Sequence, residues 1–563
     1  MGLAQVSIND KYTLERGRVL ISGVQALVRA LFMQRQRDRA AGLDTAGFVS
    51  GYRGSPLGGL DLQLMRNKGL LDENDIVFEP GLNEDLAATA VWGSQQANAL
   101  PGATKDGVFG MWYGKGPGVD RSGDALKHAN NAGSSPVGGA LAVFGDDHPG
   151  KSSTLAHQSE HAFIGFNMPI LYPATVQEYI DYALLGWALS RYSGLWVGFK
   201  CVNETVESTA TVDIDPERLN IVLPELDDGS VHIKIRYAPQ DDDVVVQRER
   251  MPRAHAFNAA NGIDKVMFGD ADSARFGIVT AGKAWLDVME ALTALGIDEA
   301  RAEELGLAVY KVGMVWPLNG EGLRNFGAGL SELIFVEEKR EIVESQAAAA
   351  LYGLKDADRP QISGKAAPDG TLLLPSDVQL NATIVALALV SRLEAMGLSD
   401  DALKARAAAL AADTQTATSV TGSELVRSPY FCSGCPHNRS TKVPEGSIAA
   451  SGIGCHGMAV FAVPNTVTGT QMGAEGANWI GIAPFTDTPH LFQNIGDGTY
   501  SHSGLLAIRA SINAGVNITY KILYNDAVAM TGGQPVEGTL TVDQIARQIA
   551  AEGVQQIAIV SDE

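Results

Sequence analysis

The chain has 563 residues, more than one hydrophobic core can serve, so we expect about three or four domains. Hydrophobic residues make up 45% of it and charged residues 19%, an ordinary globular composition that excludes a disordered or fibrous protein. The net charge of −22 disfavours binding to nucleic acid, and the apolar runs are too short to cross a membrane.

From about residue 17 to 200, helices and strands alternate. Helical spacing runs through 23–38 and 178–192, and strand-like runs fall at 47–50, 106–113, 138–147 and 194–200. The first of these strands ends in the glycine- and proline-rich turn GYRGSPLGG. Alternation of this kind predicts an α/β fold with doubly wound, parallel sheets.

A second α/β block begins near Phe276. We expect strands at 276–282, 308–313 and 332–338, and helices at 284–296 and 320–330. The stretch before this block, 205–265, is charged and weakly patterned, and we interpret it as a long surface connection. After the block, 380–412 looks helical, and TQTATSVTGSE reads as a linker.

The last block runs from about Arg427 to the apolar run QQIAIVSDE, which we expect to be a strand. A parallel strand is normally followed by further elements. The chain therefore looks truncated at its C-terminus, or like one piece of a split protein.

Four cysteines are too few for a disulfide framework, and the N-terminal sequence lacks a signal peptide, so we expect a cytoplasmic protein. Three of the four form the run Cys432-Ser-Gly-Cys435 and, twenty positions later, Cys455. Thiolates in glycine-rich turns suit zinc or an iron–sulfur cluster, and the spacing alone favours zinc with His437 or His456 as a fourth ligand. Buried cysteines without a ligand are the plainer alternative.

The most specific motif is Gly496-Asp497-Gly498, followed after 26 residues and a strand-like run by Asn525. A carboxylate, an amide oxygen and the carbonyl of Ala527 are suitable Mg²⁺ ligands, while the glycines let backbone N–H groups approach a diphosphate. An ordinary turn between strand and helix is the alternative. The spacing resembles the thiamine diphosphate signature.

These motifs in this order resemble the 2-oxoacid:ferredoxin oxidoreductases, and in particular the long, fused, bacterial indolepyruvate ferredoxin oxidoreductases. GYRGSPLGG, FEPGLNEDLAATAVWG, GDDHPGKSS and GDGTYSHSG each look like a segment of that family. The resemblance covers most of the chain. The family's fourth cluster cysteine lies beyond the GDG segment, where this chain has no cysteine, so the fourth ligand of a [4Fe-4S] cluster is missing here.

The resemblance implies four regions, two of them thiamine diphosphate-binding folds. Residues 1–265 would bind the pyrimidine, 266–380 would form a small transketolase-C-like domain, 381–426 a helical segment and linker, and 427–563 the diphosphate-binding domain. The family's thiamine site forms where the two kinds of domain meet, commonly with dimerisation.

The resemblance also assigns roles to single residues. Glu84 would be the carboxylic acid at the pyrimidine, Ser55 a hydroxyl near the substrate carboxylate, and Lys115 a cation facing substrate or cofactor. His502 would reach the diphosphate or the reacting carbon, and Gly454 and His456 would line the cofactor. A helix cap, a turn serine, a surface lysine and a structural histidine are the plain alternatives.

Three further histidines cluster in GDDHPGKSSTLAHQSEH. A metal site on His148, His157 and His161 is possible, and so is a substrate-lining loop with Lys151 and Ser152; a loop of solvated polar residues is the simplest interpretation.

The implied activity is oxidative decarboxylation of an aryl 2-oxoacid to an acyl-CoA. It would use thiamine diphosphate, Mg²⁺ and a [4Fe-4S] cluster, with electrons passing to ferredoxin. A homodimer, or a complex with a C-terminal portion or a gamma-like subunit, is expected. The alternatives are a non-oxidative thiamine diphosphate-dependent decarboxylase or carboligase, and a non-catalytic subunit or fragment.

Overall fold

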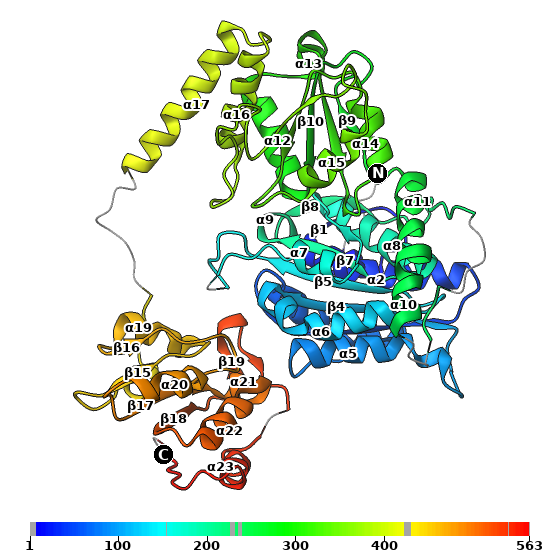
Figure 1. The fold of residues 1–563 in the computed structure, drawn as a ribbon. Helices are drawn as coiled ribbons and strands as arrows, with labels where there is room; N and C mark the ends of the chain where they lie inside the picture. The colour runs from blue at the N-terminus through cyan, green and yellow to red at the C-terminus, as the bar shows by residue number, and fades with distance from the viewer. Residues whose placement is uncertain are drawn as a thin grey trace. The chain divides into compact units, whose positions relative to one another are not determined.

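The structure is a computed structural model, and it describes residues 7–153, 155–225, 231–234, 239–420, 429–538 and 540–561. The chain divides into two compact units: residues 1–80 with 84–422, and residues 81–83 with 423–563 (Figure 1). Both are built from helices and largely parallel sheets, so the predicted α/β class is confirmed. Among the described residues, no helix combines the length and the apolar character that crossing a membrane requires.

The first unit contains a seven-stranded sheet in the order β12-β6-β7-β5-β4-β2-β3, parallel except for β12. Its strands are β2 (Thr45–Gly51), β3 (Ile76–Phe78), β4 (Gly107–Lys115), β5 (Ala140–Asp146), β6 (Ile170–Leu171), β7 (Val197–Val202) and β12 (Met314–Trp316). Its main helices are α2 (Gly23–Ala40), α3 (Gly58–Arg66), α5 (Glu84–Gln95), α6 (Gly116–Ala132), α7 (Glu160–Gly165) and α8 (Val176–Ser193).

Alternate residues of each strand face opposite layers of helices. Met111 packs with the core beneath α2 and α8, whereas its neighbour Trp112 packs beneath α5 and α6. Because side chains alternate along a strand, a parallel strand covered on both faces is apolar throughout, and the buried run of β4 has this pattern.

A second, five-stranded sheet in the same unit has the order β14-β13-β10-β11-β9. It comprises β9 (Lys265–Phe268), β10 (Phe276–Ala281), β11 (Leu307–Val312), β13 (Glu332–Val336) and β14 (Gln361–Ser363). Helices α12 (Gly282–Leu295), α13 (Glu299–Leu305), α16 (Ala382–Ala395) and α17 (Asp401–Val420) belong to one face, and α14 (Gly320–Gly327) and α15 (Val343–Tyr352) to the other. The second face shares one core with the seven-stranded sheet.

Two connections differ from the prediction. Residues 205–265, predicted as a surface connection, contain β8 (Thr209–Asp213), which pairs with β1 (Arg18–Ser22), and the helical run α10 (Pro239–Val245), η2 (Val246–Arg250) and α11 (Met251–Asn261). Phe257 of α11 is buried in the core beneath α8, and this contact anchors the otherwise polar stretch to the first unit. The predicted linker is helical up to Val420; the rest of it, with the boundary at 426, lies outside the described residues. The other domain boundaries stay predictions.

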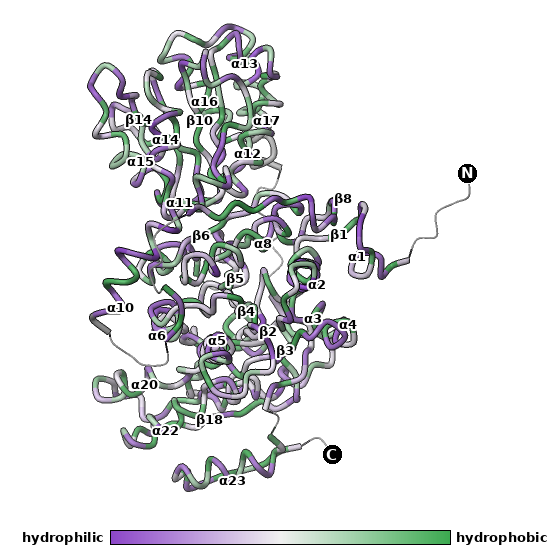
Figure 2. The backbone as a smooth tube through the Cα atoms, turned by 90° about the vertical axis from the view of Figure 1, so that its right-hand side faces the viewer, coloured by the Kyte–Doolittle hydropathy of each residue, from purple (hydrophilic) through white to green (hydrophobic). Residues whose placement is uncertain are grey.

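The second unit contains a four-stranded parallel sheet in the order β16-β15-β17-β18. Its strands are β15 (Ile448–Ala450), β16 (Thr466–Val467), β17 (Leu491–Gly496) and β18 (Ile518–Leu523), and its main helices are α20 (Ala477–Ile482), α22 (Leu505–Ala514) and α23 (Val542–Ala551). Hydrophobic and hydrophilic residues mix along α23 (Figure 2), whose Ile545 is buried against Tyr500 and Ile508.

The prediction of a strand at the end of the chain is wrong. Residues 554–561 form no strand, and Ile559 and Val560 are 64% and 92% exposed. An apolar run becomes a strand only where a neighbouring strand offers its hydrogen-bonding groups, and within the described residues this run pairs with none.

Candidate active site

Three turns of the second unit meet at the carboxyl ends of its parallel strands. The turn Gly452–Gly454 lies just beyond β15, Gly496-Asp497-Gly498 ends β17, and Asn525 lies two residues beyond β18. Neighbouring parallel strands end at the same edge of a sheet, and that edge is where open α/β sheets bind ligands. The structure therefore brings the GDG turn, Asn525 and the Gly-Ile-Gly-Cys turn to one edge.

Asp497 joins two of these turns. Its side chain is 4% exposed, and Oδ2 accepts hydrogen bonds from the backbone N–H groups of Asn525 at 2.9 Å and Asp526 at 2.6 Å. Oδ1 accepts one from the N–H of Gly498 at 2.9 Å. Oδ1 keeps a lone pair, whereas the two N–H groups occupy both of those on Oδ2. The amide oxygen of Asn525, which accepts the N–H of Ala527 at 3.2 Å, lies in the same turn. These oxygens fit the ligand preferences of Mg²⁺.

The glycines of the Gly-Ile-Gly-Cys turn surround His456. Gly454 has φ +144°, and a Cβ there would lie 2.9 Å from the imidazole Cε1. A Cβ on Gly496 would lie 3.3 Å from the same atom. The imidazole is buried, and its Nε2 has no hydrogen-bond partner among the described residues. Burial, with the nearby His437, lowers the pKa of His456 to about 4, so it is a neutral imidazole at pH 7.

His502 lies in the same unit, in the π-helical turn Tyr500–Gly504 between the GDG turn and α22. Its side chain is 4% exposed, and Nδ1 lies 2.6 Å from the hydroxyl of Ser503. His502 thus lies near the start of the helical run that follows the GDG turn; its contact with a cofactor stays a prediction.

Glu475 is a buried residue of this edge that the sequence analysis missed. Its side chain is fully buried, with one oxygen 2.7 Å from the N–H of Gly473 and the other 3.2 Å from the N–H of Ile453. It stands in the run MGAEGANW, which matches no spacing rule for an acid. The sequence signal that could have identified it as a buried acid is a lone glutamate among small and apolar residues.

The three clustered cysteines lie in the same unit. Cys432 is exposed, and Cys435 and Cys455 are partly buried. Burial raises the pKa of the Cys455 thiol, and the other two thiols are near enough to raise it further. Cys435 Sγ lies 3.2 Å from Nδ1 of His437, whose ring stacks on His456 at 6.2 Å.

The prediction that Cys432, Cys435 and Cys455 bind an iron–sulfur cluster stays a prediction. In the parts of the chain that the structure describes, no three His, Cys, Asp or Glu side chains converge as metal ligands. Cys201 is buried in β7 of the first unit, beside Tyr179, where burial raises its pKa.

In the first unit, Glu84 and Lys115 lie at the ends of elements, and Ser55 lies in the turn between β2 and α3. Glu84 begins α5 and is 5% exposed; its carbonyl accepts the indole N–H of Trp112 at 2.9 Å, and its side chain packs on Gly118. Burial lowers the pKa of Lys115 at the end of β4, and Glu84 and Asp147 oppose that shift. The Ser55 hydroxyl lies 3.5 Å from Oδ1 of Asn203. Lys115 is thus a shielded lysine rather than a solvated one.

The histidine-rich loop does not form a cluster of three. His148 is buried, with Nδ1 2.9 Å from the carbonyl of His157, whereas His157 faces Asp120 at 3.3 Å and His161 is exposed. Lys151 and Ser152 are exposed as well. The geometry favours a structural role for His148 and a solvated outer loop.

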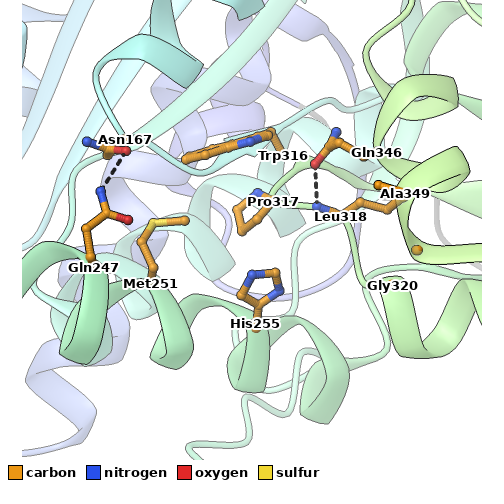
Figure 3. Close-up of a pocket in the computed structure, with 11 residues that line it drawn as sticks. Asn167, Gln247, Met251, His255, Trp316, Pro317, Leu318, Gly320, Gln346 and Ala349 are labelled. Atoms are coloured by element: carbon orange, nitrogen blue, oxygen red, sulfur yellow. Dashed lines mark hydrogen bonds between the residues drawn. The ribbon is translucent and has the colours of Figure 1, made fainter. Parts of the chain in front are cut away.

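A cavity of about 410 Å³ lies elsewhere in the first unit (Figure 3). It contains none of the predicted site residues. Its lining includes Gln247 of η2, Met251 and His255 of α11, Trp316 at the end of β12 and Gln346 of α15.

Comparison with known proteins supports the resemblance inferred from the motifs. Residues 265–417 match the family model described as the indolepyruvate oxidoreductase domain. Two relatives named indolepyruvate oxidoreductase subunit IorA come from Methanothermobacter marburgensis, 23% identical over 98% of this chain and 82% of the relative, and Archaeoglobus fulgidus, 25% identical over 93% and 77%. The predicted resemblance to the indolepyruvate oxidoreductases and the oxidoreductase class are confirmed.

One similar solved structure is the 2-oxoglutarate:ferredoxin oxidoreductase from Magnetococcus marinus with 2-oxoglutarate, coenzyme A and succinyl-CoA bound. The TM-score is 0.48 at 15% sequence identity. The alignment covers 67% of this chain and spans 65% of that one.

Proposed function

We propose, on the premise that the chain is an oxidoreductase related to the indolepyruvate oxidoreductases, that it oxidatively decarboxylates a 2-oxoacid. The observation that carries the proposal is Asp497, which is buried at a sheet edge and joins the GDG turn to the turn of Asn525. The finer proposal is an aryl 2-oxoacid converted to an acyl-CoA, with electrons passing through an iron–sulfur cluster to ferredoxin or a similar acceptor.

The second unit is proposed to hold thiamine diphosphate through Mg²⁺. The metal would take Asp497, Asn525 and the carbonyl of Ala527, while N–H groups of the GDG turn and the Gly454 turn would face the diphosphate. Bound thiamine diphosphate would supply a carbanion and act as the electron sink of the decarboxylation. His456, neutral and with Nε2 unpartnered among the described residues, would donate or accept a hydrogen bond at this edge.

The first unit is proposed to supply Glu84, Lys115 and Ser55. Burial of Glu84 in a water-poor place suits a carboxylic acid that shares a proton with a ring nitrogen. Lys115, poorly solvated, would be a strong electrostatic partner for a 2-oxoacid carboxylate, because a shielded charge interacts more strongly than a solvated one. Ser55 would add a hydroxyl.

Cys432, Cys435 and Cys455 are proposed as three ligands of a [4Fe-4S] cluster. Three thiolates leave one iron without a protein ligand from this set, so the fourth must come from another residue or a partner chain. The relatives are named as subunits, which supports a complex with another subunit; a gamma-like subunit or a homodimer is the finer proposal. A cytoplasmic location is part of the proposal.

The test is an anaerobic assay of the full chain with thiamine diphosphate, Mg²⁺, coenzyme A and a viologen dye, over a panel of aryl and aliphatic 2-oxoacids. Iron and zinc are counted in the same sample, and the variant Asp497→Asn is run beside it. We expect dye reduction that depends on the cofactor and is about 100-fold weaker in the variant, since one charged ligand is lost.

The outcomes separate the alternatives. Release of CO₂ without dye reduction, in a chain holding zinc or no metal, would favour the non-oxidative decarboxylase. No turnover and no binding of thiamine diphosphate would favour the non-catalytic subunit. The matched control is Asp543→Asn, which removes an exposed carboxylate paired with Arg547 in α23 of the same unit.

A further inference from the structure

We propose that Glu475 is a positioning residue, whose buried carboxylate holds the glycine turns and the imidazole of His502 in place for the reaction. The inference deepens the proposed function and rests on it for the identity of that reaction. Its structural part concerns two residues of the second unit and can be tested without turnover.

Glu475 is fixed from several sides. One carboxylate oxygen accepts the N–H of Gly473 at 2.7 Å, and the other accepts that of Ile453 at 3.2 Å. Its own backbone carbonyl accepts the hydroxyl of Tyr520 at 2.9 Å. The bonds to Ile453 and Tyr520 tie Glu475 to two distant segments, and its side chain is fully buried, so the carboxylate has essentially one position.

The carboxylate is adjacent to the turn that carries the Gly-Ile-Gly-Cys motif. A Cβ on Gly452 would lie 2.8 Å from each of three atoms: Glu475 Cγ, His456 Nε2 and the carbonyl oxygen of Asn494. All three therefore surround one glycine, and a side chain there would push the acid away. Glu475 thus belongs to the same edge as the GDG turn.

A continuous set of contacts runs from Glu475 to His502. The acid holds the N–H of Gly473, and a Cβ on Gly473 would overlap the Ser503 hydroxyl, so this glycine packs directly on Ser503. The Ser503 hydroxyl in turn lies 2.6 Å from Nδ1 of His502. Moving the carboxylate would move Gly473, and with it the residue that bonds the imidazole.

Charge adds a direct interaction. Burial raises the pKa of the Glu475 carboxyl, while its backbone N–H partners and the positive form of His502 lower it. The titratable groups near this carboxylate are His502, His456 and the Tyr520 hydroxyl. A carboxylate beside an imidazole also fixes which ring nitrogen carries the proton.

The experiment is a ¹³C NMR spectrum, at one fixed pH, of the full chain carrying ¹³C-labelled histidine, with the His502 ring signals assigned by their loss in His502→Gln. We expect Glu475→Gln to shift these signals, because the imidazole moves with Gly473 and Ser503. In the assay, kcat should fall roughly tenfold or more while KM for the 2-oxoacid stays within about threefold. Glu475→Asp keeps the charge and should restore part of both.

The matched control is Glu445→Gln, an exposed acid of the same unit, which should leave the His502 signals unchanged. Unaltered His502 signals in Glu475→Gln would overturn the inference. Should that variant lose its near-ultraviolet circular dichroism, Glu475→Asp is decisive, since its shorter carboxylate must give a smaller shift in the same direction. Shifted His502 signals in a chain that oxidises no 2-oxoacid would reject the proposed function and leave the positioning role intact.

Discussion

The Glu84 side chain packs closely against a glycine on the neighbouring helix. A Cβ added to Gly118 of α6 would lie 2.7 Å from Cγ and 3.0 Å from Oε1 of Glu84. Real Cβ atoms do not approach other heavy atoms so closely. An alanine methyl group at position 118 would therefore force either itself or the buried Glu84 side chain to shift. The position of the carboxyl therefore depends on the absence of one methyl group.

We expect Gly118→Ala to displace the Glu84 carboxyl and lower kcat on the order of 100-fold, the cost of misplacing a catalytic group by about an ångström. The free energy of unfolding should change by less than about 2 kcal/mol, because the overlap opposes the gain from alanine in a helix. Steady-state kinetics and urea unfolding measure the two quantities.

Gly93→Ala is the matched control, since Gly93 lies on α5 beside open space with no atom within 4 Å of its added Cβ. It should keep full activity. Equal activity in both alanine variants would show that Glu84 tolerates displacement, and with it that Glu84 has no role in the chemistry.

At the scale of elements, α15 begins at a buried acid that lies outside the helix. Glu337 follows β13, and its carboxyl accepts the N–H groups of Ile342 at 3.0 Å, Val343 at 2.9 Å and Glu344 at 3.0 Å. These donors are the free N–H groups of the first turn, so the acid caps α15 from a distance. Burial nevertheless outweighs them and raises the pKa of Glu337 from 4.5 to about 6.

The direction of this shift predicts a pH dependence. Between pH 4.5 and 6 the folded chain holds a proton on Glu337 that the unfolded chain has released, so the contribution of this carboxyl to stability falls as the pH rises. Gln does not titrate, so the cost of Glu337→Gln in unfolding free energy should be about 1.5 kcal/mol smaller at pH 7.5 than at pH 4.5.

Urea unfolding of both proteins at the two pH values measures this cost. Glu321→Gln, an exposed acid in the first turn of α14, should show no such change. A cost that grows with pH would mean that the three N–H groups dominate over burial and that the pKa is lowered.

What sequence reasoning could predict depends on how local the physical signal is. The buried strands β4, β5 and β10 can be predicted from their continuous apolar runs. Asp497 and Asn525 can be predicted from their fixed spacing across one helix and one strand. Glu475 has no such signal, because its partner Ile453 lies 22 residues away and is brought to it by the tertiary fold. The run 555–560 has strand composition but finds no neighbouring strand among the described residues, and composition carries no information about that neighbour.

At the scale of the whole molecule, the two units differ greatly in the size of their cores. The first unit buries long apolar sets shared between sheets and helix layers. Among its described residues, the second has two small apolar clusters with three buried residues each. Since burial of apolar surface is the main stabilising term, the second unit should be the less stable one.

We therefore expect two transitions in calorimetry of the full chain, the lower one from the second unit. A ligand that binds only the folded form stabilises by about 2.7 kcal/mol at a hundred times its Kd, which for a unit of this size raises the transition by roughly 10 °C. Thiamine diphosphate with Mg²⁺ should raise the lower transition by that amount. Asp497→Asn should abolish the rise, whereas Asp543→Asn should preserve it. If the cofactor raises only the upper transition, the diphosphate is bound by the first unit, and the assignment of Asp497 and Asn525 is wrong.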